Sequence, residues 1–349
     1  MLVRTSFLLI LSLAFIPVLN ACDACGTHAS QPAQGGASGF TASTDNDGYK
    51  WSFDTSFEYR NFAKVDIERA HAIHESDRDT HGFLYDWHVT SRFGYSVTKD
   101  LNVGISQSYR LLKMRNIHGG PDHHDEEAEA PEDGEEAAPP EPDVPDPILG
   151  RRETSKGLTD LTLDVKWRFK KQEDGGFPVD LALFGSLKPP SGDSNNRNPD
   201  GKRFEEEEQP GTGSWNGTIG IAASKTWGPW GASGAVSHTF KGEGTQHFKE
   251  GDATVFSLSG SRLMTPKKMG LKIYTSLGVQ TILEDKAVEY SKKSPDHGGQ
   301  NIFLLPAVTI QPIKRLTISI GGSVPVYQEE NGFHQKQDFG AQIHVGVRF

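Results

Sequence analysis

The residues best suited to chemistry in this 349-residue chain are histidines, cysteines and carboxylates that could bind a metal ion. Glu68, His71 and His74 are spaced three residues apart. On a helical turn they would share one face and offer two imidazoles and a carboxylate, a set that suits Zn²⁺, Cu²⁺ or Ni²⁺. The alternative is a solvated polar loop in which the histidines are incidental.

A second candidate metal site lies in an acidic stretch. His118, His123 and His124 occur among carboxylates, and residues 118–147 carry about twelve Asp and Glu but no Lys or Arg. Adjacent histidines among carboxylates are typical of flexible chelating tracts, although the signal is one of composition only. We therefore expect residues 116–156 to form a disordered loop, which accounts for the formal net charge of −10.

A third candidate is the pair Cys22 and Cys25, followed by His28. Two thiolates and an imidazole could hold Zn²⁺ or Cu(I). A disulfide is equally sensible in an oxidising compartment. A third interpretation is lipidation of Cys22, because the four residues that end at this cysteine resemble a lipobox.

The beginning of the chain predicts export. Residues 7–19 form the only sustained apolar run; it follows Arg4, and Ala21 occupies a plausible cleavage position. About 13 residues is too short for a membrane-spanning helix, so residues 1–21 are interpreted as a signal peptide. The Gly- and Ser-rich residues 22–48 are expected to be a tether or a plug of the lumen.

In the remaining chain, residues 49–349, apolar and polar residues alternate along successive runs, as in strands that are apolar on one face and polar on the other. The pattern is clearest in residues 158–170 and in the terminal run 339–349. Twelve strands are predicted, at residues 50–62, 82–97, 101–115, 158–170, 178–188, 214–226, 230–240, 252–263, 270–283, 301–311, 316–326 and 339–349.

The connections between these runs alternate between short and long. This pattern is typical of an all-β, antiparallel up-and-down transmembrane β-barrel of about twelve strands, with short periplasmic turns and long extracellular loops. Aromatic residues gather near the short-turn ends, as an interfacial girdle would: Trp167, Phe169, Trp227, Trp230 and Phe349. We expect an outer-membrane location.

Charged residues on the polar faces of the strands should line the lumen. Both signs occur, so these side chains could brace the barrel as ion pairs or could form a constriction that selects solutes. The predicted pore-lining residues are Asp54, Glu58, Arg60, Asp86, His88, Arg92, Arg110, Asp160, Asp164, Lys166 and Arg168.

Three short segments carry a family resemblance. They are GLTD at residues 157–160, LKPPSG at 187–192 and PGTGS at 210–214. In this order they resemble the outer-membrane transporter family associated with the meta-pathway of phenol degradation, over roughly residues 51–349. The chain departs from the family pattern at Thr159, Pro189 and Ser191, and in the acidic insert before Gly157. We interpret the glycines and prolines as architectural, because they end and bend strands.

The resemblance implies a β-barrel with a transport role, and the aromatic end at Phe349 resembles the signal read by the barrel-assembly machinery. The leading hypothesis is therefore a channel for small solutes, and the resemblance implies that these are hydrophobic or aromatic compounds. The alternative is binding or transport of Zn, Cu or Ni through the histidine-bearing loops and the cysteines. A barrel hydrolase built on His88, His238 or His344 is a third hypothesis, without local spacing to a nucleophile. We expect no enzyme activity and no nucleic-acid partner, since the one strong charge cluster is acidic.

Overall fold

The computed structural model describes residues 48–63, 80–117, 152–172, 176–265, 270–294, 297–331 and 336–349. The predicted signal peptide and tether lie outside these ranges, so both stay predictions. Among the described residues, no helix is long and apolar enough to cross a bilayer.

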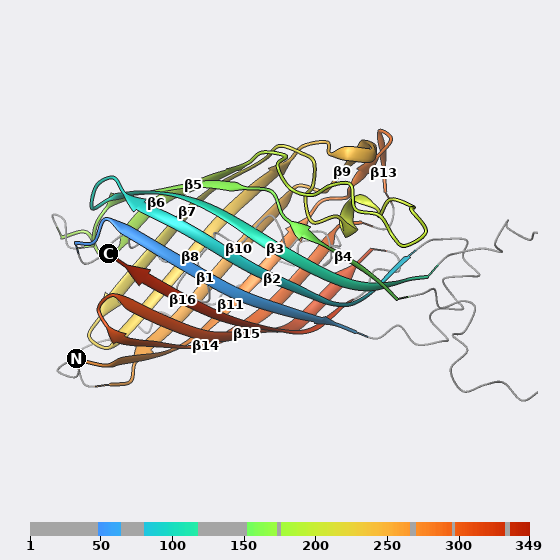
Figure 1. Ribbon diagram of the computed structural model, residues 1–349. Coiled ribbons are helices and arrows are strands. Elements are labelled where there is room, and N and C mark those ends of the chain that lie inside the picture. Colours follow the sequence, from blue (N-terminus) through green and yellow to red (C-terminus); the bar gives the residue numbers. More distant parts are fainter. Residues whose placement is uncertain are drawn as a thin grey trace, which may run out of the picture.

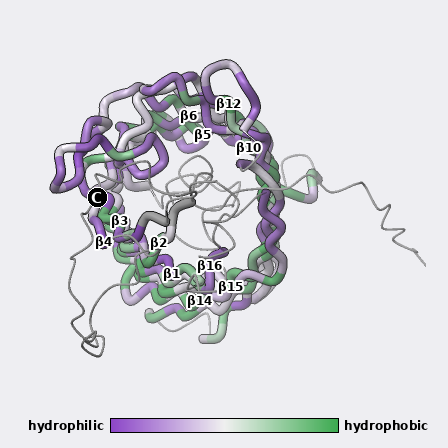
Figure 2. Tube along the Cα trace, turned by 90° about the vertical axis from the view of Figure 1, so that its right-hand side faces the viewer, coloured by the Kyte–Doolittle hydropathy of each residue, from purple (hydrophilic) through white to green (hydrophobic). Residues whose placement is uncertain are grey.

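The described chain forms a closed antiparallel barrel (Figures 1 and 2). Its strands are β1 (Trp51–Phe62), β2 (Thr80–Ser96), β3 (Leu101–Ile117), β4 (Arg152–Leu158), β5 (Thr162–Lys170), β6 (Asp180–Lys188), β7 (Asn216–Trp227), β8 (Trp230–Lys241), β10 (Ala253–Leu263), β11 (Lys272–Glu284), β14 (Gly299–Ile313), β15 (Leu316–Glu330) and β16 (Gln337–Arg348). Strand β1 pairs with both β2 and β16, which closes the ring. Because β4 and β5 both pair with β3, they count as one wall strand, and the predicted number of twelve is confirmed.

The wall is apolar on its outer side. In β1, Phe53 and Phe57 are each 44% exposed, whereas Arg60, which points the other way, is 3% exposed. The other wall strands repeat this pattern, with large apolar side chains exposed and polar ones buried. A continuous apolar exterior would be unfavourable in water but matches the hydrocarbon of a membrane.

The connections also follow the prediction. Strands joined by short turns meet at the end of the barrel where the C-terminus lies, and the long connections gather at the other end (Figure 1). The long connections carry the 3₁₀ turns η3 (Glu206–Glu208) and η4 (Thr245–His247). They also carry a small sheet of β9 (Phe248–Lys249), β12 (Val288–Glu289) and β13 (Lys292–Lys293). Short turns face the periplasm in barrels of this kind, so we call the long-loop end the outer end.

The predicted fourth strand differs from the structure. The sequence favoured one strand over residues 158–170, preceded by a loop over 116–156, but β3 continues to Ile117 and β4 already begins at Arg152. The wall strand is then interrupted at residues 159–161. The reason is Asp160, whose carboxylate turns away from the ladder and binds backbone amides of a neighbouring loop.

Candidate functional site in the barrel lumen

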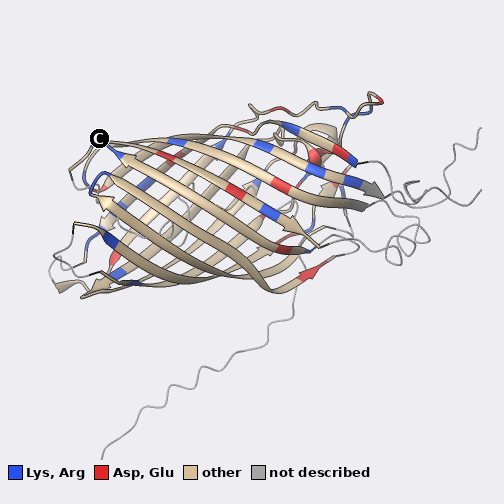
Figure 3. Ribbon diagram, turned by 60° about the horizontal axis from the view of Figure 1, so that its bottom comes forward, with Lys and Arg blue, Asp and Glu red and all other residues tan. Residues whose placement is uncertain are grey.

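A buried cluster of charges lies on β1, β2 and β3. Asp86 is 1% exposed and accepts hydrogen bonds from Arg60 Nη2 at 3.0 Å and from Arg110 Nε at 3.3 Å. His88 Nε2 lies 3.1 Å from the same carboxylate, and Glu58 lies 3.6 Å from Arg60 Nε. Figure 3 shows how residues of both signs follow neighbouring strands. One carboxylate is thus shared by two guanidinium groups, which fixes the side chains of three strands.

The same cluster holds a loop inside the barrel. We call residues 189–215, between β6 and β7, the inner loop. Arg110 Nη1 donates hydrogen bonds to the backbone carbonyls of Glu207 and Gln209, both at 2.9 Å. Residues 206–212 are buried. The sequence had predicted a polar loop on the outside at this point, and the inner loop instead fills part of the lumen.

Asp160 anchors both ends of the inner loop. One carboxylate oxygen accepts hydrogen bonds from the backbone N–H groups of Ser191 at 2.9 Å and Gly192 at 2.8 Å. The other accepts from the backbone N–H and the hydroxyl of Thr212, both at 2.8 Å. The three segments that carry the family resemblance therefore meet at one buried carboxylate, 2% exposed. This meeting point agrees with the architectural interpretation of those segments.

Glycines make the close approach at this anchor possible. A Cβ on Gly192 would lie 2.5 Å from the carbonyl carbon of Thr159, and one on Gly211 would lie 2.7 Å from that of Gly192. Both distances are far shorter than a carbon–carbon contact allows, and the neighbouring atoms belong to the backbone. Two glycines of the resemblance segments are thus required by packing at this point.

A second charged group lies nearer the short-turn end. The guanidinium of Arg92 forms two hydrogen bonds to Asp164, at 2.9 Å and 2.6 Å, and lies 3.8 Å from Asp54. His344 Nε2 is 3.3 Å from Asp54. Arg92 reaches from β2 to β5 by crossing β3 at Gly104, where an added Cβ would lie 2.3 Å from Arg92 Nη2. Gly104 therefore leaves the room that this bidentate ion pair needs.

Gly104→Val should break this ion pair. The valine side chain would occupy the position of the guanidinium, leaving Arg92 and Asp164 without their two charge-assisted hydrogen bonds in a poorly solvated lumen. We expect a loss of about 2–4 kcal/mol of unfolding free energy and an altered preference of the channel between anions and cations. Chemical denaturation in micelles and reversal potentials in planar bilayers measure the two effects. Gly260→Val, at a position with open space around it, is the matched control, and equal effects of both would contradict the prediction.

The remaining predicted lumen residues are also buried or half-buried. Arg168 donates to the Asp100 carboxylate at 2.6 Å and 3.0 Å, close to the short turn between β2 and β3. Lys166 is half-buried on the same face of β5, between Asp164 and Arg168. All eleven residues thus occupy the inner side of the wall or the inner-loop anchor. Their role in selecting solutes stays a prediction.

Further charges tie the inner loop to the outer end of the barrel. Lys241 Nζ lies 2.8 Å from Glu284 and 3.0 Å from Glu250, and all three side chains are buried. Glu206 accepts hydrogen bonds from the backbone N–H of Thr245, at 3.0 Å, and from its hydroxyl. Burial raises the pKa of the Glu206 carboxyl to about 7, although the bonds from Thr245 act in the opposite direction. Sequence reasoning placed none of these residues in the lumen.

The contact between Glu206 and Thr245 should weaken as the pH rises. The Glu206 carboxyl has a pKa near 4.5 when it is free in solvent and about 7 when it is held against Thr245. Between pH 4.5 and 7 the held state therefore binds more protons than the free state. The held state therefore loses stability from about pH 4.5 to 7, and the loss is complete above that range. Hydrogen exchange of residues 204–208 and 242–247, corrected for intrinsic rates, should show less protection at pH 8 than at pH 5.5. Glu206→Gln should abolish the difference, and a difference that persists in this variant would exclude Glu206 as its source.

Part of the lumen is apolar. Val255, Ile282 and Phe303 are each 4% exposed or less and pack together on the inner sides of β10, β11 and β14. In the ring, these strands lie across from the charged cluster of β1–β3. Phe204 of the inner loop packs into a second apolar cluster, with Phe62, Phe83, Leu112 and Met114. Adjacent apolar residues such as Ile282 and Leu283 interrupt the alternation along the strand and indicate an apolar inner position.

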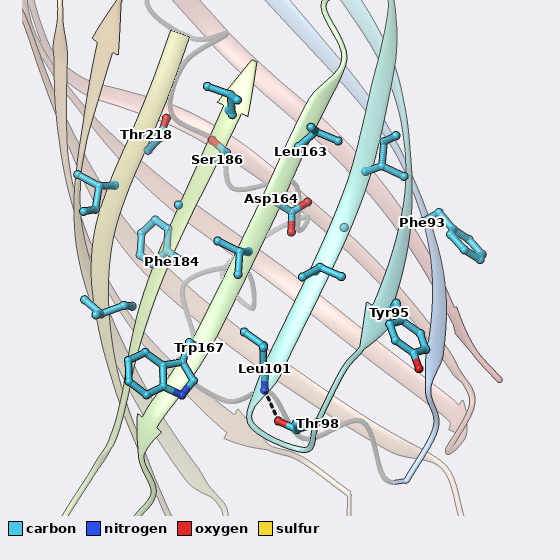
Figure 4. Close-up of a pocket in the computed structure, with 18 residues that line it drawn as sticks. Phe93, Tyr95, Thr98, Leu101, Leu163, Asp164, Trp167, Phe184, Ser186 and Thr218 are labelled. Carbon is cyan, nitrogen blue, oxygen red and sulfur yellow. Dashed lines mark hydrogen bonds between the residues drawn. The ribbon is translucent and has the colours of Figure 1, made fainter. Parts of the chain in front are cut away.

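An open apolar pocket lies on the outer side of the wall, over β2, β3, β5, β6 and β7 (Figure 4). Its volume is about 1210 Å³. Trp167, Leu183 and Phe93 contribute outward-facing apolar surface, whereas Asp164 and Ser186 approach from the inner side. The pocket thus touches residues of both faces of the same wall.

The predicted metal ligands cannot be placed. Cys22, Cys25, His28, Glu68, His71, His74, His118, His123 and His124 all lie outside the described residues. Within the described ranges, no group of three or more His, Cys, Asp or Glu side chains could hold a metal ion. The three strand histidines of the hydrolase hypothesis lie on separate strands: His88 contacts Asp86, His344 contacts Asp54, and His238 Nδ1 is 2.9 Å from the Thr254 hydroxyl.

A closed twelve-stranded barrel with an apolar exterior and a charged interior defines an outer-membrane β-barrel protein. No protein-family model matches the sequence, and no curated protein matches it. Among solved structures, the chain is similar to the COG4313 outer membrane channel from Pseudomonas putida F1. The TM-score is 0.57 at 11% identity, over 86% of this chain and 96% of that one.

Two other solved barrels are less similar. The NanC porin gives a TM-score of 0.42 at 7% identity, over 85% of this chain and 98% of that one. The toluene transporter TbuX from Ralstonia pickettii gives 0.39 at 9% identity, over 88% of this chain and 92% of that one. At 11% identity, the likeness to the COG4313 channel shows the fold alone.

Proposed function

We propose that this protein is an outer-membrane channel for small solutes, and that its solutes are hydrophobic or aromatic compounds. The observation that carries the proposal is the divided lumen. Charged side chains on β1–β3 lie across the ring from the apolar cluster of Val255, Ile282 and Phe303. A purely polar lumen is the arrangement of water-filled porins, so an apolar wall favours solutes that leave water readily.

A further observation supports this substrate class. The segments at 157–160, 187–192 and 210–214, which resemble the transporter family associated with phenol degradation, meet at Asp160. We infer a relationship to that family because these three segments occur together and meet at one buried carboxylate.

Flux into liposomes tests the proposal. The purified protein should admit benzyl alcohol derivatives faster than sugars of similar size. Val255→Thr is isosteric, and Ile282→Thr removes only one further heavy atom. Together they make the apolar wall polar, so the preference for aromatic solutes should fall several-fold. Ser257→Thr, on the inner face of the same strand, is the matched control. Equal aromatic and sugar flux in the wild type would contradict the proposed substrate class.

The metal hypothesis rests on loop and terminal residues alone. If it holds, the protein should bind zinc or copper, and deletion of residues 117–136 should abolish the share of binding that belongs to His118, His123 and His124. Isothermal titration of the full chain with each metal ion measures this directly. Binding that is unchanged by the deletion would exclude this loop as the site.

A further inference from the structure

Four basic side chains form a patch on the outside of the barrel, which we call the outer basic patch: Lys113, Arg115, Arg152 and Lys156. The neighbours Leu112 and Met114 are fully buried on β3, and β4 alternates exposed and buried residues from Arg152 to Leu158. The four basic residues occupy the alternate positions, so their side chains face away from the lumen. Strands β3 and β4 lie side by side near the outer end of the barrel (Figure 1).

The patch concentrates like charges. Arg115 and Arg152 are direct partners in the β3–β4 ladder, and Lys156 is opposite Leu111. Like charges directly opposite each other on antiparallel strands are destabilising. None of the four forms an ion pair with a carboxylate among the described residues, and Arg115 Nε is buried without a hydrogen-bond partner. The arginines Arg60, Arg92, Arg110 and Arg168 of the lumen, by contrast, all contact carboxylates.

The height of the patch on the wall matches a lipid headgroup layer. On β3 the outward side chains from Val103 to Leu111 are apolar or aromatic except Gln107, over a span of about 20 Å along the membrane normal at about 3.3 Å per residue and a tilt of about 40°. Lys113 follows directly, and its ammonium lies 5.9 Å from the centre of the Tyr85 ring. An aromatic ring next to basic side chains at the edge of an apolar band is typical of a membrane interface.

Among the described residues, no other wall strand carries Lys or Arg at an outward position near its outer end. These positions hold uncharged residues such as Tyr59, Leu187, Phe240, Leu283 and Gln300, or acidic ones, Glu329 and Asp338. The basic residues are therefore confined to one side of the barrel, which indicates a localised binding site.

We propose that the outer basic patch binds the phosphate groups of the phosphorylated glycolipid that forms the outer leaflet of the outer membrane. Arginine forms paired hydrogen bonds with phosphate, and Arg115 and Arg152 stand directly opposite each other to share one such group. Lys113 and Lys156 flank the two arginines as further cationic contacts. The acyl chains would lie along Tyr109, Leu111 and Leu158 below the patch.

The competing occupant is the chain itself. Residues 118–151, which connect β3 to β4, hold about twelve carboxylates and begin directly beside the patch. The lipid is favoured because the patch faces the membrane at the height of the interface and adjoins exposed apolar side chains such as Tyr109 and Leu158.

Native mass spectrometry of the full chain in detergent, titrated with bis-phosphorylated lipid A, tests the proposal. The variant K113Q/R115Q/R152Q/K156Q should bind the lipid roughly a thousandfold more weakly, since four basic groups near an anionic surface contribute about 1 kcal/mol each. The matched control K171Q/K225Q/R262Q/K314Q removes the same charge near the short-turn ends and should bind as the wild type does. Lipid A without phosphates should bind weakly to all three proteins.

Two results would overturn the proposal. One is equal binding of bis-phosphorylated lipid A by the patch variant and the wild type. The other is binding that appears only after residues 122–143 are removed, because the acidic connection would then be the natural occupant. Heat-modifiable electrophoresis of each variant verifies that the barrel is folded, so weak binding cannot be confused with misfolding.

Discussion

Excision of residues 197–208 should raise the single-channel conductance several-fold. These residues include Phe204 and the buried turn Glu206–Glu208, which occupy the lumen beside Arg110. Asn196 and Gln209, which border the excised segment, already contact each other: the Asn196 N–H donates to Gln209 Oε1 at 2.8 Å, and Gln209 Nε2 donates to the Asn196 carbonyl at 3.1 Å. A short glycine linker can therefore join them without disturbing the anchor at Asp160.

Conductance in planar bilayers measures this effect, together with electrophoresis before and after heating to confirm a folded barrel. The matched control is Lys202→Ala, which changes an exposed residue of the same loop and leaves the buried turn in place. An excised protein that is folded but conducts no better than the wild type would show that the inner loop does not limit passage.

Asp160→Ala should destabilise the barrel more than the removal of any single exposed charge. The substitution leaves three backbone N–H groups and one hydroxyl without their acceptor, and it removes the anion that lies 3.7 Å from Lys188. Buried donors that lose a charged acceptor cost about 1–3 kcal/mol each before water or rearrangement compensates. We expect a net loss of about 3–5 kcal/mol of unfolding free energy, as for other broken buried pairs.

The temperature at which the compact form disappears in electrophoresis, and urea unfolding in micelles, measure this loss. Asp180→Ala is a useful control, because Asp180 accepts one described hydrogen bond, from the Gln172 N–H at 2.7 Å, near a short turn. It should cost about 1 kcal/mol. If both variants unfold at the same temperature, the anchor contributes little to stability.

The wall of the barrel could be predicted from the sequence because its signal is local. Residues that alternate between lipid and lumen reveal each strand, and the lengths of the connections reveal the two ends. The same alternation assigned Arg60, Asp86, Arg92 and Arg110 to the inner face before any contact was known. Each of these inferences needs only the period of two residues along a strand.

The content of the lumen could not be predicted in this way. Arg110 and Glu207 are far apart in the sequence, and only the barrel's closure brings the inner loop to the charged cluster. Residues 205–209 are strongly polar, so composition favours a solvent-exposed loop. Inside the barrel, Glu206 instead accepts from Thr245, Glu207 contacts His297, and Gln209 donates to the carbonyls of Asn196 and Phe204. The interruption of the fourth strand did have a sign in the spacing of its leucines. Leu158 and Leu163 are five residues apart, so in a regular strand they would face opposite sides, yet both face outward, which requires an irregularity at residues 159–161.

The anchor at Asp160 and the contact between Asn196 and Gln209 divide the chain into two parts with different constraints. The wall is fixed by its ladder, and the roots of the inner loop are fixed by a few backbone amides. Residues 197–208, between Asn196 and Gln209, are constrained only by their contacts within the lumen. Substitutions in these twelve residues can change which molecules pass through the barrel without disturbing its wall strands. Relatives of this chain can therefore evolve new substrate preferences on an unchanged barrel.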